Sequence, residues 1–260
     1  YYYLTFVMES TALRAIQAAS NGIQLLNSGF TVIRDVGNNA MYADTALRQA
    51  IEQGWLPGPT VVPSGPIIGS TGGQFWPTPE MYKEHKLMFP EYIDADTPDE
   101  IVKAIRQNML LGARTIKLCV DCKPWGYSVD DIKLAITEAA KGGCKVEGHV
   151  QTPDGAQRAI DAGIYVIAHG NALTPDHHRQ MAEKGIFRAG TDTPFTKYRG
   201  SEAAFRQIVA KLSSRSTTSE TSRETSLPRC PMATPMSAAR SAGASLTPSP
   251  VMATTSPRLL

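Results

Sequence analysis

Short apolar stretches alternate with helix-like stretches along most of this 260-residue chain, and this alternation strongly constrains its fold. Repeats of roughly 20 to 30 residues indicate a parallel sheet with right-handed crossovers. About six strands are predicted, and their short, regular spacing in the second half favours a (β/α)8 barrel, or most of one, over an open doubly wound sheet. Strands are expected at residues 30–37, 114–120, 145–150, 165–170 and 186–192 and within 58–76, and helices at residues 9–27, 43–54, 99–111, 128–143, 152–162, 174–184 and 201–212.

The sequence changes character after Leu212. Residues 213–260 contain no aromatic residue, no Asp and no Lys, and consist mainly of Ser, Thr, Ala, Pro and Arg. Such a segment cannot bury much apolar surface, so we expect residues 1–212 to form the barrel domain and 213–260 to be a disordered tail. The same composition arises when a GC-rich coding sequence is read in the wrong frame, a hypothesis that sequencing of the transcript would test.

Charge, hydropathy and cysteine content exclude several classes of protein. The net charge is +2, which gives no reason to expect binding to nucleic acid or to an anionic membrane. Apolar runs stay well below the ~18 residues of a membrane span, and a signal-peptide pattern is absent. The 4 cysteines are too few for a disulfide scaffold and favour a reducing compartment. We therefore expect a cytoplasmic protein that acts on a small molecule.

Polar residues occur where several predicted strands end. In parallel α/β folds this edge binds ligands, and here it carries Lys117, His149, His169 and Asp192. One histidine near a strand end is usually structural, whereas two at equivalent ends of consecutive strands favour a site. Imidazole and carboxylate ligands suit zinc and similar divalent metals. Lysine becomes a ligand only when it is deprotonated or carboxylated by CO₂.

Other chemically suggestive residues have simpler interpretations. Cys119 and Cys122 have C-x-x-C spacing but close a strand, whereas redox motifs begin helices, so neither a redox nor a structural-metal role is favoured. Asp35 is interpreted as the buried cap of the turn that follows it. His177 and His178 are expected to be solvated on a helix.

The order of the stretches LLNSGFTVIRDVG, GPTVVPSGPIIGSTGG, GARTIKLCV and KVEGHVQTPDGAQRAIDAGIYVIAHG resembles that in the metal-dependent amidohydrolase superfamily, in its imidazolonepropionase-like and prolidase-like branch. The resemblance implies a (β/α)8 barrel with one or two divalent metals, most commonly zinc, in which a metal-activated water attacks an amide or lactam carbonyl. Lys117 would match the carbamylated lysine of strand 4, and His149 and His169 the histidines of strands 5 and 6. A strand-8 aspartate would handle the proton, and AGTD at Asp192 imitates that signature.

The sequence also departs from the family pattern. A His-x-His pair is expected on strand 1, and the chain contains none, so two ligands of the more buried metal are missing. Gln74 stands where the family often has a histidine, and Ala168 where a glutamate commonly precedes the strand-6 histidine. Gln74 and Tyr127, in two of the βα loops, are candidate substrate contacts. At most one metal is therefore well supported.

The position of Asp192 raises a problem of counting. The 22 residues between His169 and Asp192 have room for one helix and one strand, and two such units need about twice as many. Asp192 is therefore expected to end strand 7 rather than strand 8. It would be the catalytic aspartate only if a whole unit was deleted and the barrel closed around the loss.

The prediction is a barrel that lacks strands 1 and 8, in a hydrolase acting on C–N bonds of small amides, dipeptides or lactams. Open barrel edges would invite pairing with a second chain and formation of a homo-oligomer. The main alternative is a catalytically impaired remnant, or pseudoenzyme, that binds a small molecule or a partner. A third is a different α/β enzyme using carboxylates such as Glu147 and Asp35, which show no clear pairing in the sequence.

Overall fold

A computed structural model describes residues 8–38, 40–74, 79, 83 and 92–190, and its strands are parallel throughout. One sheet has 6 strands in the order β4-β3-β5-β6-β7-β8, and a second has the pair β1-β2. The elements are α2 (Thr11–Asn27), β1 (Val32–Arg34), α3 (Ala43–Glu52), β2 (Thr60–Val62), β3 (Ile67–Gly69), β4 (Tyr92–Asp94), α6 (Pro98–Leu110), β5 (Thr115–Cys119), α7 (Val129–Lys141), β6 (Lys145–Val150), α8 (Pro153–Ala162), β7 (Val166–His169), α9 (Pro175–Lys184) and β8 (Phe187–Ala189).

Side-chain caps mark the starts of α2, α6, α7, α8 and α9, whereas α3 begins without one. The Ser128 hydroxyl accepts from the Asp131 amide at 3.2 Å, and the Asp131 carboxylate accepts from the Ser128 amide at 2.9 Å. Thr97 and Glu100 make the same reciprocal pair at the start of α6, with a proline in the first turn. These capping boxes satisfy amide groups that the helix leaves unpaired, so they confirm the predicted starts of α6 and α7.

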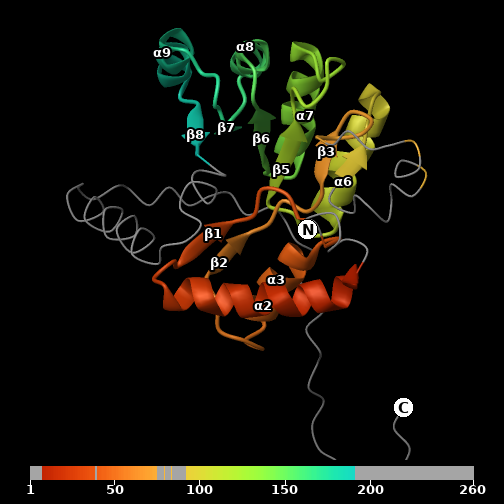
Figure 1. Ribbon diagram of the computed structural model, residues 1–260, viewed down its shortest axis with the longest axis vertical. Helices are drawn as coiled ribbons and strands as arrows, with labels where there is room; N and C mark the ends of the chain where they lie inside the picture. Colours follow the sequence, from red (N-terminus) through yellow and green to blue (C-terminus); the bar gives the residue numbers. More distant parts are fainter. Residues whose placement is uncertain (1–7, 39, 75–78, 80–82, 84–91, 191–260) are drawn as a thin grey trace, which may run out of the picture.

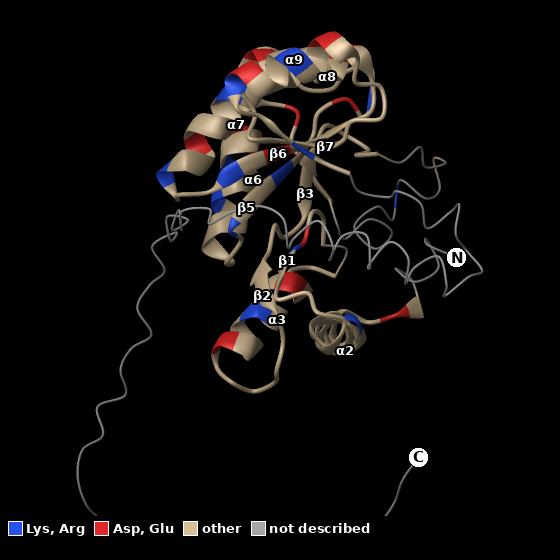
Figure 2. Ribbon diagram, turned by 90° about the vertical axis from the view of Figure 1, so that its left-hand side faces the viewer, with Lys and Arg blue, Asp and Glu red and all other residues tan. Residues whose placement is uncertain are grey.

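The larger sheet has one face covered by helices (Figure 1). Helices α6 to α9 pack there over a buried apolar cluster that includes Ile116, Leu118, Val146 and Ile167. Alternate residues of a strand point to opposite faces, so Lys117 and Cys119 of β5 point to the other side. Helices α2 and α3 and the β1-β2 pair lie on that side, in both Figure 1 and Figure 2. The site residues therefore lie between the larger sheet and the β1-β2 region.

The predicted strand at residues 30–37 is shorter and less buried than expected. It is reduced to β1, in which Val32 is 61% exposed, because β1 pairs only with β2 in the part of the chain that is described. Strand β4 was not predicted from the sequence. Among the described strands β8 pairs only with β7, so the described strands do not form a closed barrel. The predicted alternation of helices and parallel strands is confirmed in the described residues.

Two further predictions concern residues beyond the described part. The expected helix at 201–212 and the expected disordered tail at 213–260 both lie there. Among the described helices, none is long and apolar enough to cross a membrane.

Candidate active site

Strand register brings the predicted metal ligands together. Lys117 is paired with Glu147 across β5 and β6, and Cys119 is paired with His149. Register partners in neighbouring parallel strands point to the same face, so these four side chains share the sheet face opposite the helices. Lys117 is only 1% exposed, so its side chain is buried on this face. The strand ends thus concentrate titratable groups at one place.

His169 reaches this face by an unusual backbone conformation. Its register partner is Val150, whose side chain belongs to the helix-side core. At His169 φ is +66°, in the left-handed region that residues other than glycine seldom adopt. The His169 and His149 ring centroids are 4.4 Å apart in an edge-on arrangement. An uncommon conformation of this kind often accompanies a functional site.

Burial and its neighbours keep His149 neutral. Burial, with smaller contributions from His169 and Lys117, lowers the pKa of His149 from 6.5 to about 3. A neutral imidazole is the form that binds a metal. His149 therefore presents an available nitrogen lone pair at neutral pH.

Glu147 links three elements through two ion pairs. Its Oε1 lies 3.6 Å from Lys117 Nζ, with the two side chains 1% and 2% exposed. Its Oε2 lies 3.2 Å from Nε of Arg34, in β1. Sequence reasoning found no partner for Glu147, although its place two residues before His149 put both on one strand face. The spacing of residues along one strand could not indicate Arg34, because its ion pair with Glu147 joins the two sheets.

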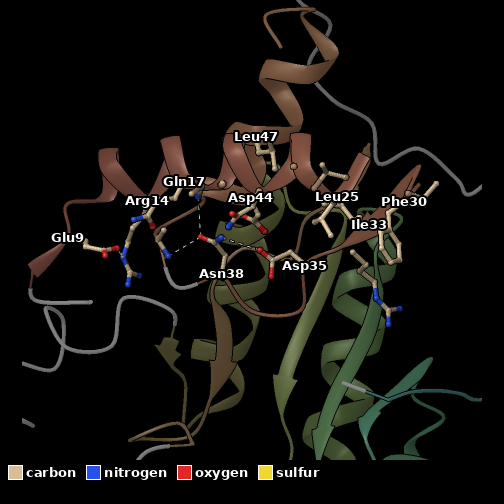
Figure 3. A pocket seen from close by; sticks show the side chains of 18 residues that line it. Glu9, Arg14, Gln17, Leu25, Phe30, Ile33, Asp35, Asn38, Asp44 and Leu47 are labelled. Atoms are coloured by element: carbon tan, nitrogen blue, oxygen red, sulfur yellow. Dashed lines mark hydrogen bonds and ion pairs between the residues drawn. The ribbon is translucent and has the colours of Figure 1, made fainter. Parts of the chain in front are cut away.

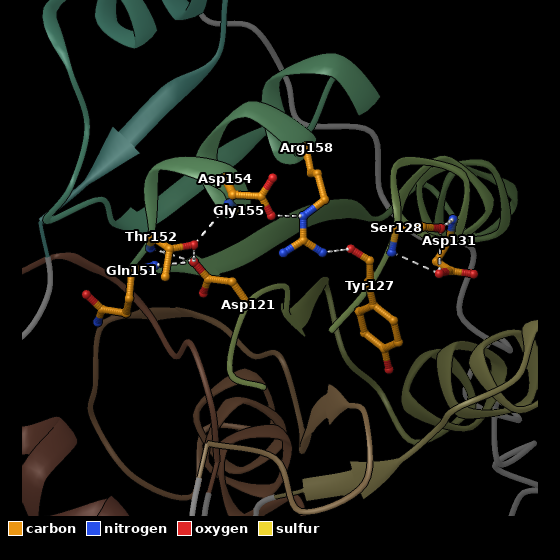
Figure 4. Close-up of polar contacts among 9 residues, drawn as sticks. All are labelled: Asp121, Tyr127, Ser128, Asp131, Gln151, Thr152, Asp154, Gly155 and Arg158. Atoms are coloured by element: carbon orange, nitrogen blue, oxygen red, sulfur yellow. Dashed lines mark hydrogen bonds and ion pairs between the residues drawn. The ribbon is translucent and has the colours of Figure 1, made fainter. Parts of the chain in front are cut away.

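Asp121 fixes the loop that follows His149 (Figure 4). Its Oδ2 accepts from the Gln151 amide at 2.8 Å, the Thr152 amide at 2.6 Å and the Thr152 hydroxyl at 2.8 Å. Thr152 in turn caps α8 by accepting from the Gly155 amide at 3.0 Å. One carboxylate therefore ties the end of β5 to the turn between β6 and α8.

Tyr127, another predicted site residue, lies away from this face. Tyr127 is buried in the helix-side core, where its hydroxyl donates to the Ala95 carbonyl at 2.8 Å. Gln74 is half-buried and Asp192 lies outside the described residues, so their roles, like that of Tyr127, stay predictions. His177 was wrongly expected to be solvated: it is 7% exposed, because its Nδ1 accepts from the Thr174 amide in the cap of α9.

A cavity of about 770 Å³ lies between α2, β1 and α3 (Figure 3). Leu25, Phe30 and Leu47 contribute apolar surface to it, and Asp35 and Asp44 contribute carboxylates. Asp35 accepts from the Gly37 amide at 3.1 Å and from the Asn38 side chain at 3.2 Å. These bonds confirm the interpretation of Asp35 as the cap of the turn that follows it. Burial, with a smaller effect of Asp35, raises the pKa of Asp44 to about 6.

The family model for the amidohydrolase family matches residues 10–227. The chain belongs to this family. Ochratoxinase from Aspergillus niger is 27% identical over 205 residues, covering 68% of this chain and 42% of its own. A prolidase complexed with N-methylphosphonate-L-proline is 26% identical, with a TM-score of 0.62 over 81% of this chain and 55% of its own. A Xaa-Pro dipeptidase with bound methionine is also 26% identical, with a TM-score of 0.58 over 68% and 46% of the two chains.

The resemblance inferred from the sequence is thereby confirmed, as is a fold of the TIM-barrel type. The structure of A. niger ochratoxinase superposes with a TM-score of 0.64 at 22% identity, which supports the fold alone. This amidohydrolase chain spans less than half the length of the curated relative that it matches, at 42%.

Proposed function

We propose that this chain carries one half of a metal-dependent amidohydrolase centre, held by Lys117, His149 and His169, that hydrolyses C–N bonds of small amides, dipeptides or lactams. The observation that carries the proposal is the pair of imidazole rings 4.4 Å apart at the ends of neighbouring strands. Zinc, the expected ion, commonly takes imidazole nitrogen and carboxylate oxygen as ligands.

The candidate ligands fit a divalent metal, with the two histidines available directly and Lys117 only after chemical modification. His149 is held neutral and His169 lies against it, so the two residues would offer two nitrogen ligands. Lys117 is paired with Glu147 and would join only after CO₂ converts its ammonium group into a carbamate. That change replaces a cation by an anion beside Glu147, and Arg34 would remain as a balancing cation. When bound, the metal would supply polarisation of a water molecule and of the substrate carbonyl.

The chain's own groups have separate tasks in this proposal. His149 and His169 hold the ion, and Asp121 orients the loop after His149 through its three hydrogen bonds. Arg34 and Glu147 set the charge around Lys117. Names of relatives suggest the first substrates to try, which are Xaa-Pro dipeptides and ochratoxin.

A second candidate function is a catalytically impaired remnant that binds a small molecule. The absence of a His-x-His pair from the sequence favours it, because the more buried metal of the family would lack two ligands. The large cavity beside α2 offers room for such a molecule.

Metal analysis combined with turnover distinguishes the two functions. The purified chain is incubated with zinc and bicarbonate, then assayed for bound metal and for cleavage of Xaa-Pro dipeptides and ochratoxin. Stoichiometric zinc that is lost in His149→Ala, His169→Ala and Lys117→Ala, but kept in the exposed control His178→Ala, supports the proposed centre. Zinc content and turnover unchanged in the first two variants would overturn it. No metal and no turnover in the parent chain would favour the remnant.

A further inference from the structure

A second group of potential metal ligands overlaps the proposed centre at His149. The Sγ atoms of Cys119 and Cys122 and a ring nitrogen of His149 all lie within 4.8 Å of one another. In a tetrahedral zinc site, bond lengths of about 2.0–2.3 Å place ligand atoms roughly 3.3–3.8 Å apart. Cys119 and Cys122 are joined by a disulfide in the structure, so their sulfur atoms must separate before they can take these positions.

The backbone holds these three residues in place. Cys119 is the register partner of His149, so their side chains leave the same face of adjacent strands. Cys122 is returned toward them by a tight turn, in which the Tyr127 amide donates to the Val120 carbonyl at 3.1 Å and the Gly126 amide to the Lys123 carbonyl at 3.0 Å. A Cβ at Gly126 would lie 2.4 Å from the Val120 oxygen, so only glycine fits this turn.

The turn is also tied to the strand that carries His149. The Val120 amide donates to the His149 carbonyl at 3.1 Å. Asp121, next to Cys122 in the chain, accepts from the Gln151 amide at 2.8 Å. The cluster is thus anchored on both strands, unlike two cysteines that meet on a surface loop.

The cluster has two mutually exclusive states. In the structure Cys119 and Cys122 form a disulfide with Cα atoms 5.7 Å apart, a normal separation for such a bond. Cys119 is 1% exposed, whereas Cys122 is half-buried and so can be reached by a reductant or a metal ion. Sulfur binds zinc as a thiolate, and the disulfide withholds both thiolates.

We propose that Cys119, Cys122 and His149 form a site for a thiophilic divalent cation such as Zn²⁺ when both cysteines are reduced, and that the disulfide abolishes this site. A thiol reductant supplies two electrons and two protons to break the S–S bond and is itself oxidised to a disulfide. Both thiols release their protons when the cation binds. Soft sulfur ligands select such ions over magnesium or calcium. The site would also compete with the proposed hydrolytic centre for His149.

Cobalt(II) titration of the full chain tests the proposal, because thiolate ligation gives an intense near-ultraviolet charge-transfer absorption. The reduced chain is expected to develop this band at one cobalt per chain, and the oxidised chain is not. The band should disappear in Cys119→Ser and Cys122→Ser and weaken in His149→Gln. Cys144→Ser and Cys230→Ser, which remove thiols outside the C-x-x-C pair, are the matched controls and should keep it.

A second measurement needs no variant. Zn²⁺ bound to the reduced parent chain should protect Cys119 and Cys122 from alkylation, as located by mass spectrometry, and leave Cys144 and Cys230 as reactive as before. Absence of the band from the reduced chain, or a band that depends on Cys144 or Cys230 instead, would overturn the proposal. The band is read without substrate and should survive His169→Gln, so failure of the hydrolase proposal leaves this result interpretable.

Discussion

The Lys117 ammonium group and the Glu147 carboxylate lie 3.6 Å apart with both side chains almost completely buried. Removing one partner of a buried ion pair typically costs about 3–5 kcal/mol, because the other charge is left uncompensated. Glu147→Gln should therefore lower the free energy of unfolding by that amount, measured by urea denaturation. Asp161→Asn is the control: it removes the partner of Lys184 in a pair that is about half exposed, and should cost about 0–1 kcal/mol. Equal losses in the two variants would contradict the prediction.

Acidification should destabilise the chain through His149. Its pKa is about 3 when folded, and in the unfolded chain it is near 6.5, so between these values the unfolded state binds more protons. The stabilisation of the folded state by neutral His149 is fully present above pH 6.5. It is lost progressively as the pH falls from 6.5 toward 3, so the free energy of unfolding decreases over this range. The slope is at most about 1.4 kcal/mol per pH unit.

A comparison of pH profiles isolates this effect. Asp44, with a pKa raised to about 6, acts in the opposite direction, because its protonation favours the folded state as the pH falls. His149→Gln in the metal-free chain should therefore lose less stability than the parent between pH 6.5 and pH 4. The exposed-residue variant His178→Gln should follow the parent profile. Identical slopes for the parent and His149→Gln would refute the assignment.

Asp121→Ala should loosen the turn after β6. The substitution removes the acceptor of three hydrogen bonds, two from backbone amides, and hydrogen bonds to a charged group contribute about 1.5–3 kcal/mol each. Because the amides can turn to water, we expect a net loss of roughly 2–3 kcal/mol. Hydrogen exchange should show faster exchange at Gln151 and Thr152. Asp154→Ala, which removes an 81% exposed partner of Arg158, should leave those two amides protected.

The conformation of His169 predicts an inverted preference between glycine and alanine. Because φ is +66° there, His169→Gly should be more stable than His169→Ala by about 1 kcal/mol. The neighbouring Ala168, which lies in regular strand β7, should show the reverse, with Ala168→Gly destabilised by about 0.5–1 kcal/mol. Thermal unfolding of these variants measures both differences. A glycine that is no better than alanine at residue 169 would argue against the left-handed conformation.

Features set by neighbouring residues could be predicted from the sequence. The start of α7 follows from Ser128 and Asp131, and the position of Lys117 near the end of a strand follows from its apolar neighbours. The clustering of His149 with His169 followed from their equivalent places at consecutive strand ends. In each case the determining residues are close in sequence or belong to repeated units.

Three features were not predicted, and one of them depends on a contact between residues far apart in the sequence. The Arg34–Glu147 ion pair joins the two sheets, and no local pattern marks it. The disulfide was passed over because its cysteines end a strand instead of beginning a helix. His177 was wrongly predicted because a polar residue on a helix is normally exposed to solvent. Its ring instead accepts a hydrogen bond from the Thr174 amide at the start of the same helix.

The two histidine rings belong to a single strand–helix–strand unit formed by β6, α8 and β7. Their meeting depends on the pairing of two consecutive strands and on the one helix between them, and not on whether a ring of strands is completed. Folding can therefore assemble this part of the site through contacts of short sequence separation, which carry the smallest loop-closure entropy. Transplanting residues 145–170 into another parallel α/β scaffold would move the imidazole pair as an independent module.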